Sequence, residues 1–595
     1  MIQMYPARVK VMGPPGTGKT TFLMSLVRQA VESGRYPPGE IAFLSYTTAA
    51  AEEARDRIVS TLPGMDAEQF PWFRTLHSAC KKLLDISEAS LMVGKRIKEF
   101  KDSTGFEISA SIDAETAFFS SSLTLGDICL AAKSYASHSK IGFRESLNIR
   151  NQNTANPVVY PKACVFLRDY ERFKARSMEH PQLYDFDDLL LSVLENQIPL
   201  GRIRLLIVDE AQDLSPLMFD VVQMWSVSGK IEQTILAGDP YQAIYEFQGA
   251  EPKLMCDWQA DRSYTLDESF RCPSQVRAAS RAIVEKMKHR YPNDDYAPRK
   301  IGGFVQKSRG VDLKQLIDSR KYCYWLVRDN HTLISIAAKA KRLGLPYGYV
   351  SEKKKSTMQG KTAQAISFIQ RLRQGAKITP LEYLEITEIV KSKDNLKHGS
   401  KALFKKHLGQ INSDLWTEAI YDVEDLISLG WTEPGVESIV NGSIWKKLNK
   451  EVNIETVLYI LSIIDRWGET TLRAKPRLQL GTLHSSKGKE SEIVIIDPSF
   501  PKMVARSYQK SSDVENRLAY VGVTRAKEGV YIQRPEQVSA GWFYPYPSGP
   551  FVEQSIPKNP LDRPKAICEI LGIGNRFKQD IFFGEDFSFD DAVCF

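Results

Sequence analysis

The most constraining feature of this sequence is a glycine-rich turn that links a strand-like run, Arg8–Met12, to a helical pattern over about Thr20–Val31. The turn fits the pattern G-x-x-x-x-G-K-[ST] and consists of Gly13, Pro14, Pro15, Gly16, Thr17, Gly18, Lys19 and Thr20, followed by Thr21. Glycines let backbone N–H groups turn inward around phosphate oxygens, and the helix directs its positive N-terminal end at the same anion. Lys19 can reach the outer phosphates, and the Thr20 hydroxyl can ligate Mg²⁺. The turn therefore predicts a nucleotide-phosphate site.

A second apolar run, Leu205–Val208, leads directly into the paired carboxylates Asp209 and Glu210. Metal-assisted phosphoryl transfer needs such a pair: Asp209 can hold Mg²⁺, while Glu210 can orient and deprotonate the attacking water. A solvated acidic turn after a core strand is the alternative. Together with the phosphate loop, the pair predicts an ATP-hydrolysing site.

Strand-like runs occur in two groups that alternate with helical patterns, as in parallel α/β sheets. The first group is Arg8–Met12, Ile41–Tyr46, Leu205–Val208 and Thr234–Ala237; the second is Tyr324–Val327, Ile493–Ile496 and Val530–Ile532. The helical patterns Thr48–Ile58 and His331–Leu343 follow one strand of each group. We expect an α/β protein with two parallel-sheet cores. Two lysine-rich and mainly helical regions, residues 86–182 and 353–476, look like insertions into them.

Composition excludes some classes of protein without selecting one. The net charge of +7 over 595 residues permits nucleic-acid binding but does not require it. None of the eight cysteines is paired at Cys-x-x-Cys spacing, which argues against a zinc ribbon or iron–sulfur cluster. No apolar run approaches the roughly 18–20 residues needed to cross a bilayer, and the N-terminus lacks a signal-peptide pattern. We expect an intracellular protein with no membrane partner.

Further segments, in order along the chain, make the sequence similar to the UvrD/Rep-like superfamily 1 DNA helicases. They are Arg74–His77, Asp185–Leu190, Asp209–Asp213 (motif II), Gly238–Ala250 (motif III), Leu266–Arg271 (motif IV), Gly481–Glu490 (motif V) and Glu515–Lys527 (motif VI). The resemblance implies two RecA-like lobes with ATP in the cleft between them. The expected boundaries are 1–85 and 183–262 for the first lobe, 86–182 for its insertion, 263–352 and 477–545 for the second lobe, 353–476 for its insertion, and 546–595 for a peripheral tail.

The resemblance also implies roles for residues of the nucleotide site. The first lobe supplies Lys19, Thr20, Asp209, Glu210 and Gln242. Arg525 from the second lobe and Arg271 from the joining segment approach the γ-phosphate, where a guanidinium stabilises transferred charge. Phe270 is placed to stack on adenine and Glu490 to bind ribose, and Gln3 is the sole candidate for the family's adenine-reading glutamine.

A track for single-stranded DNA and its junctions with duplex is implied in the same way. Tyr46, Tyr245 and Phe247 match positions that stack on bases, and stacking of this kind tolerates any sequence. Backbone contacts are expected at Thr75, His77, Thr482 and His484, for which capping of strands or turns is the alternative. Thr47 is also expected to bind DNA. Motif III has Phe247-Gln248 where Trp-Arg is common, so one cationic contact is missing.

The expected function is an ATP- and Mg²⁺-dependent DNA helicase that moves on single-stranded DNA as a monomer or weak oligomer. The phosphate loop is more typical of the 5′ to 3′ branch, but motifs III and VI favour 3′ to 5′ movement. A translocase that strips proteins without separating strands and a non-hydrolysing DNA-binding scaffold remain alternatives. The acidic and aromatic end of the chain, residues 584–595, is either a protein-docking tail or a solvated terminus.

Overall fold

The computed structural model describes residues 7–109, 123–152, 154, 156–175, 182–291, 296–308, 311–351, 354–409, 417–418, 420–449, 452–499, 512–533 and 561–572. These residues form two compact units. The first takes in the described parts of Met1–Phe304, Pro501–Thr524 and Tyr544–Phe595, and the second those of Val305–Phe500 and Arg525–Phe543. Each unit is described by itself below.

The first unit is built on a parallel sheet in the strand order β3-β2-β4-β5-β1-β6. Its strands are β1 (Arg8–Met12), β2 (Ile41–Ser45), β3 (Phe73–Thr75), β4 (Leu205–Val208), β5 (Gln233–Gly238) and β6 (Arg262–Thr265). The central strands β2, β4 and β5 are buried along their whole length, as expected for a sheet covered on both faces.

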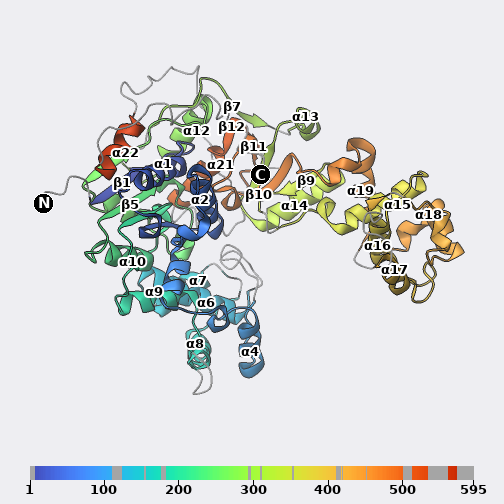
Figure 1. The fold of residues 1–595 in the computed structure, drawn as a ribbon, viewed down its shortest axis with the longest axis horizontal. Coiled ribbons are helices and arrows are strands. Elements are labelled where there is room, and N and C mark those ends of the chain that lie inside the picture. Colours follow the sequence, from blue (N-terminus) through green and yellow to red (C-terminus); the bar gives the residue numbers. More distant parts are fainter. Residues whose placement is uncertain are drawn as a thin grey trace. The chain divides into compact units, whose positions relative to one another are not determined.

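Helices cover both faces of this sheet (Figure 1). The helices in contact with the sheet are α1 (Lys19–Glu32), α2 (Thr48–Thr61), α3 (Leu76–Leu83), α9 (Phe186–Glu195), α10 (Pro216–Ser226), α11 (Pro252–Asp257) and α22 (Arg563–Leu571). Two further helices of the unit, α12 (Ser274–Val284) and α21 (Ser512–Val523), pack against each other. Alternate residues of β4 face opposite sides, so Leu205 and Ile207 pack with α1, α2 and α22, whereas Leu206 and Val208 pack with α3, α9 and α10.

A helical insertion between β3 and β4 has an apolar core of its own. Its helices are α4 (Lys95–Thr104), α6 (Leu125–Ser139), α7 (Phe143–Asn151) and α8 (Tyr160–Lys174). Phe100 of α4 lies at the centre, where its ring meets Phe166, Tyr170 and Phe173 of α8 edge-on. Such edge-to-face pairs add about 0.5–1.5 kcal/mol each beyond the apolar area that they bury.

The second unit has a sheet in the order β7-β12-β11-β8-β10-β9, in which the pairs from β12 to β9 are parallel. Its strands are β7 (Phe304–Ser308), β8 (Cys323–Val327), β9 (Tyr347–Tyr349), β10 (Leu478–Thr482), β11 (Ser491–Ile496) and β12 (Ala526–Gln533). Its helices are α13 (Leu313–Asp318), α14 (Asn330–Arg342), α15 (Lys361–Arg373), α16 (Pro380–Ile389), α17 (Ser400–Leu408), α18 (Glu433–Val440) and α19 (Ile454–Trp467). The predicted class, α/β with two parallel-sheet cores, is confirmed.

The division into units differs from the expected boundaries in three places. The boundary at residue 262 falls inside β6, which pairs with β1, so the first unit continues through α12 to Phe304. The helix α21 groups with the first unit, where Asp513 accepts hydrogen bonds from the backbone of Lys288 and His289. The expected peripheral tail contains α22, which packs into the core of the first unit.

None of the helices in the described ranges is both long enough and apolar enough to cross a membrane.

The burial of α22 leads to a first prediction. Ile567 is fully buried beside α1, so Ile567→Ala should destabilise the first unit by about 2–5 kcal/mol, through lost transfer free energy and the cavity left behind. Lys565→Ala, at an exposed position of the same helix, is the matched control. Thermal unfolding of both variants should show a lower midpoint for the first alone; equal midpoints would contradict the packing.

Candidate active site

The phosphate loop joins β1 to α1, and its shape depends on glycine. Gly16 and Gly18 have φ of 71° and 70°, in the left-handed region that favours glycine. A Cβ atom at Gly16 would lie only 2.4 Å from Cβ of Arg271, and one at Gly13 only 2.8 Å from Cδ of Lys19. Among the described residues, no side chain caps the first turn of α1. Its N–H groups therefore remain directed at the loop, as an anion site requires.

Lys19 connects the loop to the end of β4. Its ammonium forms an ion pair with Asp209 and a second one with Glu210, in which Nζ lies 2.8 Å from Oε1. Burial alone would lower the pKa of Lys19, but the two carboxylates raise it above its ordinary value. Lys19 therefore stays charged in the interior, as contact with phosphate demands.

Asp209 and Glu210 follow β4 with different backbone conformations. Thr20 Oγ1 donates a hydrogen bond to Asp209 at 3.2 Å, so a hydroxyl and a carboxylate face each other beside Lys19. Burial raises the pKa of Asp209, and the ammonium of Lys19 opposes that rise. Glu210 has φ of 56°, which is uncommon for a residue with a side chain, and its N–H donates to Asp209 Oδ1 at 2.8 Å.

A network of amides joins these carboxylates to the end of β5. Gln212 donates from Nε2 to Glu210 and accepts at Oε1 from the N–H of Asp239, at 3.0 Å. Gln242 donates to Asp239 at 2.8 Å. Burial raises the pKa of Asp239 to about 6. Gln242 is thereby connected to Glu210 through two intervening residues, Asp239 and Gln212.

The segment Ser269–Arg271 lies against the phosphate loop. Ser269 Oγ donates to the carbonyl of Pro15 at 2.8 Å, and the N–H of Phe270 donates to the carbonyl of Gly16 at the same distance. The Phe270 ring lies next to Gly18, where an added Cβ would be 3.8 Å from it. The structure thus brings Phe270 and Arg271 to the predicted nucleotide site.

An aromatic pair lies at the carboxyl ends of β2 and β5. The rings of Tyr46 and Tyr245 are stacked with centroids 4.8 Å apart, and the Tyr46 hydroxyl donates to Gln248. Both side chains are partly exposed. Phe247, by contrast, is only 8% exposed and meets Tyr245 edge-on from below the surface. Two of the three predicted stacking residues therefore lie at the surface.

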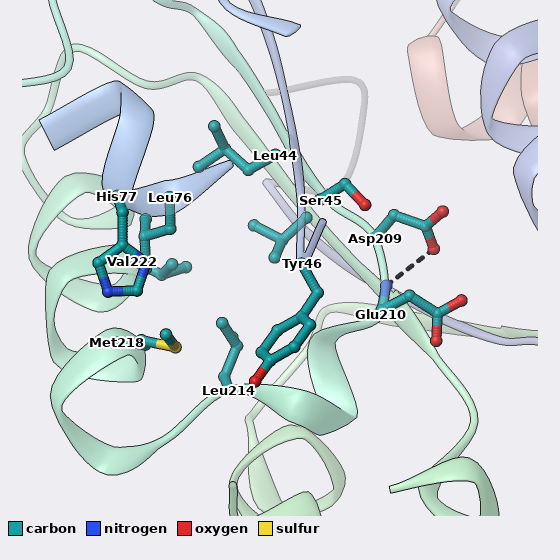
Figure 2. Close-up of a pocket in the computed structure, with 11 residues that line it drawn as sticks. Leu44, Ser45, Tyr46, Leu76, His77, Asp209, Glu210, Leu214, Met218 and Val222 are labelled. Atoms are coloured by element: carbon teal, nitrogen blue, oxygen red, sulfur yellow. Dashed lines mark hydrogen bonds between the residues drawn. The ribbon is translucent and has the colours of Figure 1, made fainter. Parts of the chain in front are cut away.

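Tyr46 of the aromatic pair and the two carboxylates line one pocket (Figure 2). Tyr46, His77, Asp209 and Glu210 line it, with His77 and the carboxylates at opposite sides. Burial lowers the pKa of His77 to about 4, with a further contribution from His138, whose ring centroid is 6.2 Å away. His77 is therefore neutral near pH 7.

Two threonines that were predicted to bind DNA cap helices of the first unit, and a third threonine, predicted to bind ATP, is exposed. Thr47 and Thr75 cap α2 and α3 by accepting from the N–H groups of Ala50 and Ser78, each at 3.2 Å. Thr21 is exposed in the first turn of α1. The cap at Thr75 matches the structural alternative given for that residue, and DNA contacts at Thr47 and Thr75 stay predictions.

The remaining predicted residues belong to the second unit. Arg525 is only 1% exposed and donates from Nη1 to the carbonyl of Lys489 at 3.3 Å. Glu490 forms an ion pair with Lys527 at 2.6 Å. Thr482 and His484 are buried at the end of β10, where Thr482 accepts from the N–H of Ser485. Gln3 and the segment 584–595 lie outside the described residues.

Sequence reasoning missed three residues that hold the site together: Gln212, Ser269 and Arg517. Arg517 of α21 donates to the carbonyl of Ala243 at 3.0 Å and forms an ion pair with Glu246, so it fixes the turn that carries Tyr245. All three lie inside the motifs quoted above. The motifs were therefore the signal, but only the fold shows which partner each side chain has.

Comparisons with known proteins agree with this geometry. Residues 2–263 match the family model described as UvrD/REP helicase N-terminal domain, and residues 277–537 match the UvrD-like helicase C-terminal domain. The chain is 27% identical to "ATP-dependent DNA helicase UvrD2" of Mycobacterium tuberculosis over 297 residues, which cover 46% of this chain and 41% of that protein. It is 23% identical to "Putative ATP-dependent DNA helicase YjcD" of Bacillus subtilis, over 88% of this chain and 76% of the relative. It is 22% identical to "ATP-dependent DNA helicase Rep" of Buchnera aphidicola, over 88% of this chain and 90% of the relative.

The environment of His77 leads to a prediction about pH. Its pKa is lower in the folded protein than the ordinary 6.5, so the unfolded chain binds more protons between pH 6.5 and about 4. The contribution of His77 to stability is thus complete above pH 6.5 and is lost as pH falls towards 4. In His77→Asn, the thermal unfolding midpoint should fall less steeply over this range than in the parent protein. If the unfolding midpoint of both proteins fell equally with pH, the lowered pKa of His77 would be contradicted.

Proposed function

Because the chain belongs to the UvrD/Rep helicase family, we propose that it is an ATP-dependent motor that moves along single-stranded DNA and separates duplex DNA. The observation that carries the proposal is the cluster of Lys19, Asp209 and Glu210 at the N-terminal end of α1. The stacked Tyr46 and Tyr245 lie at the same edge of the sheet. Carboxyl ends of parallel strands are where ligands bind in such sheets.

The residues of the loop fit ATP and Mg²⁺. Side chains at Gly13 and Gly16 would fill the loop, and the uncapped N–H groups of α1 offer donors for phosphate oxygens. Thr20 and Asp209 present a hydroxyl and a carboxylate 3.2 Å apart, which are oxygen ligands of the kind that Mg²⁺ prefers. When bound, the ion would neutralise charge on the phosphates. Lys19 would exchange its ion pairs for contact with phosphate.

Hydrolysis would be carried out by residues at the ends of β4 and β5. Glu210 would orient a water and accept its proton, and Gln212 holds its carboxylate in place. Gln242 would report the presence of the terminal phosphate through Asp239. Arg271, which lies beside Gly16, and Arg525 of the second unit are proposed to stabilise the charge on the transferred phosphoryl group.

DNA binding would use the surface next to the same carboxylates. Tyr46 and Tyr245 offer partly exposed rings for base stacking, whereas Thr75 and His77 are proposed to contact the sugar–phosphate backbone. Tyr46 and Glu210 line one pocket, so movement of a base-bound Tyr46 would be felt at the hydrolytic residue. This proximity supports coupling of DNA binding to hydrolysis within the first unit.

The direction that we propose is 3′ to 5′, on the resemblance of motifs III and VI. The test is unwinding of duplexes that carry either a 3′ or a 5′ single-stranded overhang. Unwinding from the 3′ overhang alone supports the proposal, and unwinding from the 5′ overhang alone reverses the direction. ATP hydrolysis stimulated by DNA without unwinding would indicate a translocase, and hydrolysis that DNA does not stimulate would refute the motor.

Glu210→Gln keeps the size of the side chain but removes the proposed base. We expect DNA-stimulated ATP hydrolysis to fall by at least about 100-fold, the range for loss of a general base, while binding of single-stranded DNA is retained. Exposed Glu285→Gln is the control for a lost carboxylate. A Glu210→Gln protein that hydrolyses ATP as the parent does would favour the DNA-binding scaffold.

Tyr245→Ala removes one ring of the aromatic pair. A stacked base is worth about 1–3 kcal/mol, so the Kd for single-stranded DNA should rise about 5-fold to 150-fold without a change in sequence preference. Tyr245→Phe keeps the ring and should bind almost as the parent does. Fluorescence anisotropy with labelled oligonucleotides measures both; equal weakening by Phe and Ala would point to a role of the hydroxyl instead.

A further inference from the structure

The helix α22 lies C-terminal to both matched family domains, the second of which ends at residue 537, yet it is part of the first unit. Ala566, Ile567, Ile570 and Leu571 pack into the core cluster that also contains residues of α1, and Figure 1 shows the two helices side by side. Gln233 of β5 donates from Nε2 to the carbonyl of Ile570 at 2.7 Å. The helix is therefore docked by buried apolar contacts and by a buried hydrogen bond.

Docking of α22 brings the side chain of Arg563 over the ring of Phe270. The guanidinium carbon lies 5.0 Å from the ring centroid, within the range of a cation–π contact. The start of the helix is fixed here because the N–H of Leu561 donates to the carboxylate of Asp267, at 3.2 Å from Oδ2. Arg563 thus reaches the proposed nucleotide site from a segment distant in sequence.

Both groups lie beside the last glycine of the phosphate loop. A Cβ atom at Gly18 would lie 3.5 Å from Nη1 of Arg563 and 3.8 Å from the Phe270 ring. Nη2 of Arg563 is buried and has no hydrogen-bond partner among the described residues. Burial lowers the pKa of Arg563, although Glu268 and Asp267 oppose this. A buried donor without a partner is costly, so it marks a place where a ligand can supply an acceptor.

We propose that Arg563 is a base-binding residue of the nucleotide site, and that the base lies between the Phe270 ring and the Arg563 guanidinium. This inference rests on the proposed ATP site. A planar cation stacks on either face of an aromatic base, and the ring nitrogens of a base accept hydrogen bonds. Phe270 alone would offer one face. Arg563 supplies the second face and a donor, so the site binds nucleoside phosphates in preference to phosphate chains that lack a base.

Binding of a base between the Phe270 ring and the guanidinium requires a small movement of the Arg563 side chain and of no other group. A base between two planar groups needs roughly 7 Å between them, since each stacked contact takes about 3.5 Å. The observed separation is 5.0 Å, so the guanidinium would move outward by about 2 Å, which its flexible side chain can provide while α22 remains docked.

The test compares ligands with and without a base on the full-length protein. Isothermal titration calorimetry would measure Kd for ADP and for pyrophosphate in the parent protein and in Arg563→Ala, with Lys565→Ala as the control on the same helix. We expect Arg563→Ala to weaken ADP binding about fivefold to thirtyfold, the range of a desolvated cation–π contact, and to leave pyrophosphate binding unchanged. Lys565→Ala should change neither value.

Other outcomes overturn the inference. If Arg563→Ala weakened the binding of ADP and of pyrophosphate equally, Arg563 would act on the phosphates. If the binding of both ligands were unchanged, a role of Arg563 in base binding would be excluded. Tighter ADP binding would show that Arg563 blocks the base. Failure of the parent protein to bind ADP would overturn the proposed function as well, and this is separable because it is seen without any substitution at Arg563.

Discussion

The candidate site depends first on the buried ion pairs between Lys19 and the carboxylates of Asp209 and Glu210. They join the phosphate loop after β1 to the turn after β4, two strands that are separated in the sheet by β5. A buried ammonium without these partners would carry a large desolvation penalty. The loop and the acidic turn therefore stabilise each other, and the amides of Gln212 and Gln242 extend the connection to β5.

The sheet explains why residues distant in sequence converge. The strands β2, β4 and β5 are fully buried, so their side chains alternate between the two layers of helices that cover the sheet. Because these strands are parallel, their carboxyl ends all lie at one edge of the sheet. Tyr46, Asp209 and Tyr245 all follow such ends. A single edge thus holds the two carboxylates and the aromatic pair, so the proposed ATP and DNA sites lie close to each other.

The sequence predicts the long, strongly patterned elements well and the site only in part. The runs of β1 and β4 have the predicted bounds, and α1 extends the predicted range by one residue at each end. The strands β3 and β6 were missed because they are short, and β6 is half-exposed, so neither has an apolar run. The contact between Phe270 and Arg563 could not be predicted, because it depends on where α22 docks. The apolar spacing of Ala566, Ile567, Ile570 and Leu571 was a helical signal within the presumed tail.

The docking of α22 also has a consequence for biosynthesis. The first unit draws on β1 near the start of the chain and on residues 561–572, so its core remains incomplete on the ribosome until nearly the whole described chain has been made. The strands of the second unit all lie between Phe304 and Gln533, and they emerge before α22 does. The core that contains β1 can therefore close only after α22 has been made, which is later than the synthesis of every strand of the second unit.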